Sequence, residues 1–138
     1  MRTSLTILIL FICTSLHAQS NDDSKIIITF PDSIGTYERV RIALVKNDFI
    51  VKDLGVKDTI VTYPREFSNI PGFSIAKVIV EKNTVVLSGF FGSKRINDWG
   101  YSNTPKNYKP IIFYKGSKGW KLLMQIANEI GGQFTFSK

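Results

Sequence analysis

The chain contains one cysteine and one histidine, Cys13 and His17, and both lie within its first eighteen residues. The remainder, Gln19 to Lys138, therefore has no disulfide and no Ser-His or Cys-His nucleophilic pair. It also lacks the thiolate and imidazole ligands of zinc, haem and iron–sulfur sites. No D-x-[DN]-x-[DN]-G calcium loop is present. We expect no metal, no cofactor and no enzyme activity, although carboxylates, lysines and tyrosines remain as possible catalytic groups.

Long apolar runs are also lacking, apart from one near the N-terminus. Arg2 precedes an apolar stretch from Leu5 to Leu16, and a small residue, Ala18, follows it. As a helix these residues rise only about 18 Å, too little to cross a hydrocarbon core, and the bulky neighbours of Cys13 disfavour a lipid anchor. The pattern predicts a signal peptide at residues 1–18 and export to the periplasm or the exterior. Residues 19–138 then form a single domain without a transmembrane segment.

The first half of this domain reads as a series of short strands. Val40, Ile42 and Leu44 alternate with Arg39 and Arg41, a pattern typical of a half-buried strand. Turn residues separate the expected strands, which are Lys25 to Phe30, Glu38 to Lys46, Phe49 to Asp53 and Thr59 to Tyr63.

The clearest element is a hairpin from Ser74 to Phe91 with a turn at Lys82 and Asn83. In this register Val80 faces Val85, Val78 faces Leu87 and Ala76 faces Gly89. One face, predicted to be the core side, carries Ala76, Val78, Val80, Val85, Leu87 and Phe91. The other face is mixed and includes Ile79, Val86 and Phe90.

The C-terminal part predicts one helix. It runs from about Lys118 to Ile130, with Ser117 as N-cap and Gly131 at its end. A short strand at 111–115 precedes it, and a final strand follows at 133–137. These three elements are compatible with a right-handed βαβ unit. Together the patterns predict an α+β fold: a mostly antiparallel sheet of six to eight short strands packed by this helix.

Basic residues are concentrated in one segment, Gly92 to Lys121, which we call the basic window. It contains seven basic residues and one acid, Asp98, whereas residues 19–91 contain nine of each sign. Aromatic residues are interleaved with these charges. Long-range attraction from lysines and stacking on aromatic rings suit an anionic partner. The best candidates for contacts are Lys94, Arg95, Trp99, Tyr101 and Tyr108.

Two shorter motifs lie inside the basic window. Gly116 to Gly119 precedes the helix and can hold an anion through free N–H groups, but it lacks the spacing of a P-loop. Asp98 beside Trp99 resembles a carbohydrate platform. Hydrolysis of a glycan would need a second carboxylate, for which Glu66, Glu81 and Glu129 are available.

The sequence predicts a non-catalytic, exported binding module that contacts an acidic polymer or an acidic protein face through residues 92–121. Nucleic acid is not expected, because none of its recognition motifs is present. One alternative is a carboxylate-dependent glycan hydrolase using Asp98. Another is a structural envelope subunit that docks through the apolar strip of Ile79, Val86 and Phe90.

Overall fold

The computed structural model describes residues 19–52, 54–93, 95–97, 100–102 and 108–138, with backbone alone for 95–97 and 100–102. The predicted signal peptide lies outside these residues. Within these described residues, two helices and ten strands follow in chain order: β1 (Lys25–Thr29), α1 (Thr36–Lys46), β2 (Val51–Lys52), β3 (Thr59–Thr62), β4 (Arg65–Glu66), β5 (Gly72–Glu81), β6 (Thr84–Ser93), β7 (Arg95–Asn97), β8 (Gly100–Ser102), β9 (Lys109–Pro110), α2 (Lys118–Ile130) and β10 (Gln133–Ser137).

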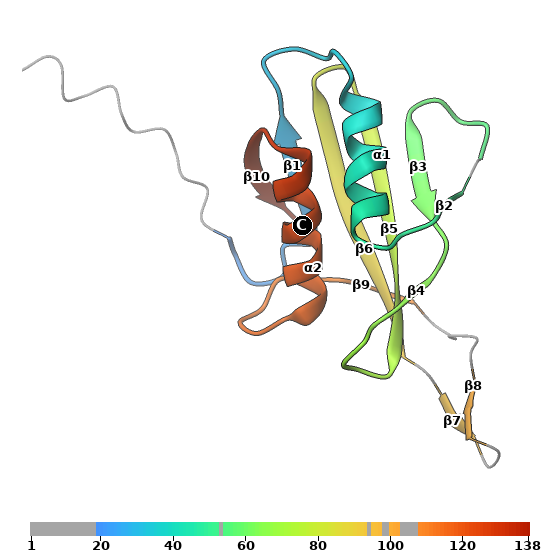
Figure 1. The fold of residues 1–138 in the computed structure, drawn as a ribbon. Helices are drawn as coiled ribbons and strands as arrows, with labels where there is room; N and C mark the ends of the chain where they lie inside the picture. The colour runs from blue at the N-terminus through green and yellow to red at the C-terminus, as the bar shows by residue number, and fades with distance from the viewer. Residues whose placement is uncertain (1–18, 53, 94, 98–99, 103–107) are drawn as a thin grey trace, which may run out of the picture.

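The strands form an antiparallel sheet that the two helices cover on one side (Figure 1). Its order is β10-β1-β6-β5-β3-β2, with β4 paired to β5 and β9 to β6, eight strands in all. Strands β7 and β8 pair separately. The predicted α+β class, with its mostly antiparallel sheet, C-terminal helix and final strand, is confirmed.

The hairpin of β5 and β6 has the predicted register, since Val80 pairs with Val85, and Val78 with Leu87. Its turn places Lys82 at a positive φ of 49°. Asn83 stabilises this turn, because its amide Nδ2 donates to the Phe30 carbonyl at 3.1 Å. In return the Phe30 N–H donates to the Asn83 carbonyl at 2.9 Å. The end of β1 therefore clamps the hairpin tip.

The predicted core side of the hairpin is the side that packs against the helices. Ala76, Val78, Val85 and Leu87 are fully buried. They join a cluster that includes Leu44 from α1 and Leu123 and Ile126 from α2. Helix α2 also begins and ends as predicted: Ser117 Oγ accepts from the Trp120 N–H at 3.2 Å, and Gly131 follows the last turn with φ 79°.

Residues 38–46 are helical, so the strand predicted there is wrong. The buried side chains of α1 are Thr36, Val40, Ala43 and Leu44, which recur at the spacing of a helix face. Ile42, which the alternating pattern placed in the core, is 48% exposed. The sequence is compatible with both the 3.6-residue repeat of a helix and the two-residue repeat of a strand, and packing against the sheet favours the helix.

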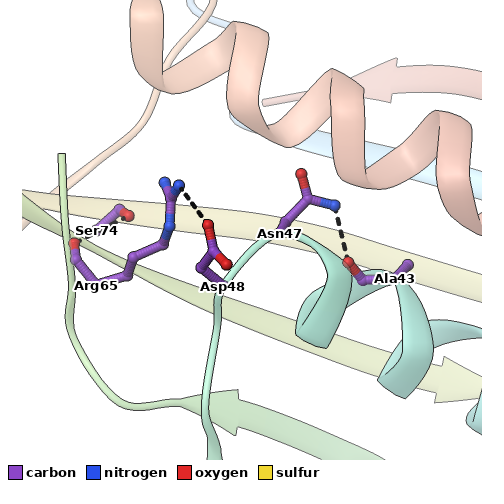
Figure 2. A network of polar contacts seen from close by, with 5 residues as sticks. All are labelled: Ala43, Asn47, Asp48, Arg65 and Ser74. Carbon is purple, nitrogen blue, oxygen red and sulfur yellow. Dashed lines mark hydrogen bonds and ion pairs between the residues drawn. The ribbon is translucent and has the colours of Figure 1, made fainter. Parts of the chain in front are cut away.

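The end of α1 is fixed by a polar network (Figure 2). The buried Asn47 donates from Nδ2 to the Ala43 carbonyl at 2.8 Å. The N–H groups of Asp48 and Phe49 donate to the carbonyls of Val45 and Leu44, which is the Schellman pattern, with Asp48 at φ 60°. Arg65 Nη2 lies 3.4 Å from Asp48 Oδ2, and the Ser74 hydroxyl donates to the Arg65 carbonyl. This network connects α1 to β4 and β5.

The βαβ unit is not formed. β10 pairs antiparallel with β1, and residues 111–115 are not a regular strand. This segment is nevertheless bonded on both sides: the Ile111 N–H donates to the Gly89 carbonyl at 2.8 Å, and the Phe113 N–H to the Asp23 carbonyl at 2.7 Å. A short β9 and these two bonds fix the entry to α2.

Candidate functional site

The five contact residues predicted from the sequence differ in how much of each the structure describes. Lys94 and Trp99 lie outside the described residues. Arg95 and Tyr101 lie on the paired strands β7 and β8, in which Ile96 is opposite Tyr101, and only their backbone is described. Tyr108 is therefore the one member of the predicted set whose side chain is described.

Tyr108 is half-buried just before β9. Its hydroxyl is out of solvent and has no hydrogen-bond partner among the described residues. Burial raises the pKa of this hydroxyl above its ordinary value of 10.0. At neutral pH the side chain is an uncharged, largely apolar surface.

The remainder of the basic window separates into surface charges and packed rings. Lys109, Lys115, Lys118 and Lys121 are all exposed. Tyr114 is 56% exposed, whereas Trp120 is only 3% exposed. The Trp120 ring packs edge-on against Phe113 at 5.7 Å between centroids and contacts Phe136 at 6.0 Å. Tyr114 is thus available to a partner, and Trp120 belongs to the core.

Two of these lysines line a hollow of about 460 Å³, which we call the lysine cleft. Its cationic members are Lys109 and Lys118, and no described residue in its lining is acidic. The full lining is Ile70, Phe91, Lys109, Pro110, Ile111, Ile112, Tyr114, Gly116, Ser117, Lys118 and Gly119. The cleft combines apolar walls, one exposed aromatic ring and a positive rim.

Ile111 holds the two sides of the lysine cleft together. Its side chain is buried between Gly89 of β6 and Gly119 of α2. A Cβ added at Gly89 would lie 2.9 Å from Ile111 Cδ1, and one added at Gly119 would lie 3.0 Å from Ile111 Cγ2. The two glycines therefore allow the close approach that brings the start of α2 against the sheet.

The start of α2 adds to the positive potential of the lysine cleft. Ser117 satisfies the Trp120 N–H, but the first N–H groups of a helix have no partner within the helix. Gly119 and Lys118, the first residues of α2, line the cleft. The positive end of the helix dipole and two ammonium groups consequently act on the same space.

The described carboxylates that were proposed for hydrolysis do not line the lysine cleft. Asp98 lies outside the described residues. Glu66, Glu81 and Glu129 do not line the cleft, and Glu129 pairs with Lys46 at 3.2 Å on the exposed surface of the helices. Among the described residues, no three histidine, cysteine, aspartate or glutamate side chains are grouped to hold a metal ion.

Sequence reasoning missed the walls of the lysine cleft. Ile70 precedes β5 and Phe91 lies near the end of β6, far from Lys118 in the chain. The signal that was present is the pair Ile111 and Ile112 within the basic window, where one residue is buried and the other is 37% exposed. An apolar pair beside lysines indicates an amphipathic surface.

In the part of the chain that the structure describes, no helix has the length and apolar character needed to span a bilayer. Comparison with protein-family models, with curated protein sequences and with solved structures finds no match to this chain. The geometry of the molecule is therefore the basis for its functional interpretation.

Proposed function

We propose that this protein is an exported, non-catalytic binding module that holds an acidic polymer or an acidic protein face in the lysine cleft. Lys109 and Lys118 attract the anionic groups. Tyr114, Ile112 and Phe91 contact the uncharged parts of the partner. Arg95, Tyr101 and the other predicted residues of the basic window extend the contact surface beyond the cleft.

The observation that carries this proposal is the composition of the lysine cleft: two exposed lysines, a helix start and no acidic side chain among its described lining. Neither lysine forms an ion pair with a described residue; other described residues do, with Lys46 paired to Glu129 and Arg65 to Asp48. Unneutralised cations beside low-dielectric walls attract anions more strongly than isolated surface lysines do.

The amphipathic character of the lysine cleft favours a polymer or a protein over a small inorganic anion. A phosphate or sulfate ion would use the lysines and the N–H groups but leave the apolar walls exposed to water. A chain that alternates acidic groups with sugar rings or aliphatic side chains covers both. Export, predicted from residues 1–18, would place such partners within reach.

The test uses labelled poly-L-glutamate and labelled heparin oligosaccharides, with binding measured by fluorescence anisotropy. The Lys109→Gln/Lys118→Gln variant should bind at least one of them about tenfold more weakly than the wild type. The matched control is Lys77→Gln/Lys82→Gln, which removes the same charge from exposed positions on the β5–β6 hairpin. A second variant, Lys94→Glu/Arg95→Glu, tests the remainder of the basic window.

Salt provides the second part of the test. Raising the salt concentration from about 0.1 M to about 1 M shortens the screening length from about 10 Å to about 3 Å. Binding should weaken strongly, and the affinities of the wild type and of the cleft variant should become similar. Equal losses in the cleft variant and the control, or binding that is indifferent to salt, would reject the proposal.

A structural-subunit role retains one supporting observation. Ile79 pairs with Val86, and Phe90 with Ile75, on the face of the hairpin opposite the helix-packed residues. These four side chains are half-buried rather than buried. Such an apolar strip suits a neighbouring chain. Concentration-dependent sedimentation of the wild type and of Val86→Lys separates this role from the binding module, because only the subunit requires self-association or stoichiometric assembly through the strip.

A further inference from the structure

A second hollow lies at the β2 end of the sheet and is distinct from the lysine cleft. It measures about 710 Å³, and we call it the edge groove. Its lining is Tyr37, Arg41, Val45, Phe49, Ile50, Val51, Lys52, Leu54, Gly55, Val56, Lys57 and Thr59. The lining residues belong to α1, to β2 and to the residues that lead to β3. Strand β2 is at the end of the sheet opposite β10 (Figure 1).

The edge groove gathers apolar side chains that remain open to solvent. Ile50 is 69% exposed, Val45 57%, Val56 55% and Leu54 50%. Tyr37 of α1 is also exposed, whereas Phe49 at the floor is buried. Single exposed apolar residues are ordinary on a protein surface, but a contiguous group around one hollow indicates a binding surface.

One edge of β2 is unpaired in the described sheet. The Tyr63 N–H donates to the Ile50 carbonyl at 2.8 Å. Alternate residues of an antiparallel strand direct their polar groups to the same side. The N–H and C=O of Val51 therefore point away from β3, toward the outer edge. Since β2 ends the strand order of the sheet, this edge is a template for one more strand.

The two sides of β2 differ in chemistry. Val51 is half-buried and packs against the core beneath the helices. Lys52 pairs with Val61 and is on the opposite face, where its Nζ lies 4.8 Å from the centre of the Tyr63 ring. An added strand would alternate in the same way, with one residue beside Val51 and its neighbours on the Lys52 face.

The charged side chains in the described lining of the edge groove have one sign. Arg41, Lys52 and Lys57 line it, and no acidic side chain is in its described lining. Glu38 of α1 and Asp58, which precedes β3, lie outside the lining. None of the three cations forms an ion pair with a described residue. A partner that fits the groove therefore combines apolar residues with acidic ones.

We propose that the edge groove binds an extended segment of a partner protein, which adds to β2 as a further strand and alternates apolar with acidic residues. The apolar residues would lie beside Val51, under Tyr37 and Val45 of α1. The acidic residues would lie beside Lys52, and Arg41 and Lys57 are the other cations of the groove. Main-chain hydrogen bonds to Val51 supply affinity, and the alternating side chains supply specificity. This site does not depend on the proposed function of the lysine cleft.

The probe is a synthetic peptide of about seven residues, the usual length of a strand. It has glutamate at alternate positions and valine or phenylalanine between them. Two matched peptides serve as controls: one carries lysine in place of glutamate, and the other is N-methylated at its central apolar residue, which removes one donor. Titration is followed by ¹⁵N-resolved amide shifts of the full chain without its predicted signal peptide, and by hydrogen exchange of the Val51 amide.

The acidic peptide should bind with a dissociation constant below about 1 mM and shift the amides of residues 50–52 and of α1. Bound peptide should slow exchange at Val51. Both control peptides and the variant Arg41→Glu/Lys57→Glu should bind at least about tenfold more weakly. The variant Lys77→Glu/Lys82→Glu has the same change in charge away from the groove and should bind like the wild type.

Other outcomes would overturn the proposal. Equal binding of the lysine-bearing peptide would show that the charges of the groove do not select acidic partners. Binding without a change at Val51 would exclude strand addition. Vesicles of phosphatidylglycerol that shift the groove amides when the acidic peptide does not would assign the surface to a membrane. Groove shifts that appear on concentrating the protein alone would assign it to a second copy of the chain.

Discussion

Replacing Ile111 by alanine tests how the lysine cleft is held together. Ile111 is 5% exposed, and truncating a buried isoleucine to alanine costs about 2–5 kcal/mol of stability. The position should fall in the upper half of that range, because two of its walls are the glycines 89 and 119. Glycine has no side chain that can relax into the void, and both backbones are already fixed in a strand and a helix. We expect a loss of about 3.5–5 kcal/mol, and about 1 kcal/mol for Ile111→Val.

A second substitution makes this expectation specific. The three atoms nearest to a Cβ added at Gly119 all belong to the Ile111 side chain, at 3.0–3.2 Å. Gly119→Ala alone therefore gains up to about 1 kcal/mol of helix propensity but crowds Ile111. In the Ile111→Ala background the crowding disappears and the new methyl group occupies part of the cavity. The double variant should be more stable than the sum of the single effects by at least about 1 kcal/mol.

The assay is urea unfolding followed by tryptophan fluorescence and circular dichroism, with all four members of the double-mutant cycle measured together. Trp120 adjoins this packing and reports its loss. Gly55→Ala is a useful contrast, because the added Cβ meets no atom within 4 Å but sits at φ 65°, so it should not couple to Ile111. Additivity of Ile111→Ala and Gly119→Ala within about 0.5 kcal/mol would refute the packing argument.

Asp48→Gly should be more stable than Asp48→Ala by about 1 kcal/mol in urea unfolding, because only glycine relieves the positive φ of the Schellman position; equal stabilities would contradict that reading. Both variants lose the contact to Arg65, whose effect is small because Asp48 is 82% exposed. Tyr108→Phe should keep the stability of the wild type at pH 7 or raise it by up to about 1 kcal/mol, since a buried hydroxyl without a described partner is removed. Burial raises the pKa of Tyr108, so the unfolded chain releases this proton first; the stability contribution is complete below pH 10.0 and is lost as the pH rises through the folded pKa. Above pH 10.0 the melting temperature should therefore fall less steeply with pH for Tyr108→Phe than for the wild type. Melting temperatures that fall in parallel would argue against burial of the hydroxyl.

The elements predicted correctly are those in which local signals agree with packing. The hairpin of β5 and β6 has alternating apolar residues on both strands, and its register follows from a two-residue turn. Helix α2 has a serine cap, a wide apolar arc and a glycine end. In α1 the signals conflict. Val40, Ile42 and Leu44 alternate as in a strand, while Val40, Ala43 and Leu44 repeat as in a helix, and only the surrounding sheet decides between them.

The sites were harder to predict because they are assembled from distant segments. Lys109 and Lys118 were visible as charges, but Ile70 and Phe91 join them only when β5, β6 and β9 pair. The edge groove depends on the position of β2 at the end of the sheet, and strand order cannot be read from a single sequence with short strands. Ile50, Leu54 and Val56 are exposed because they lie at this edge, and their apolar side chains alone would have suggested burial.

The most direct test of the central claim is to map where an anionic polymer contacts the folded protein. Titration of ¹⁵N-labelled protein with poly-L-glutamate or a heparin oligosaccharide should produce its largest amide shifts in residues 109–119 and at Ile70 and Phe91, and these shifts should disappear in high salt. Shifts spread evenly over exposed lysines such as Lys25, Lys77 and Lys82, with none concentrated around the lysine cleft, would contradict the account.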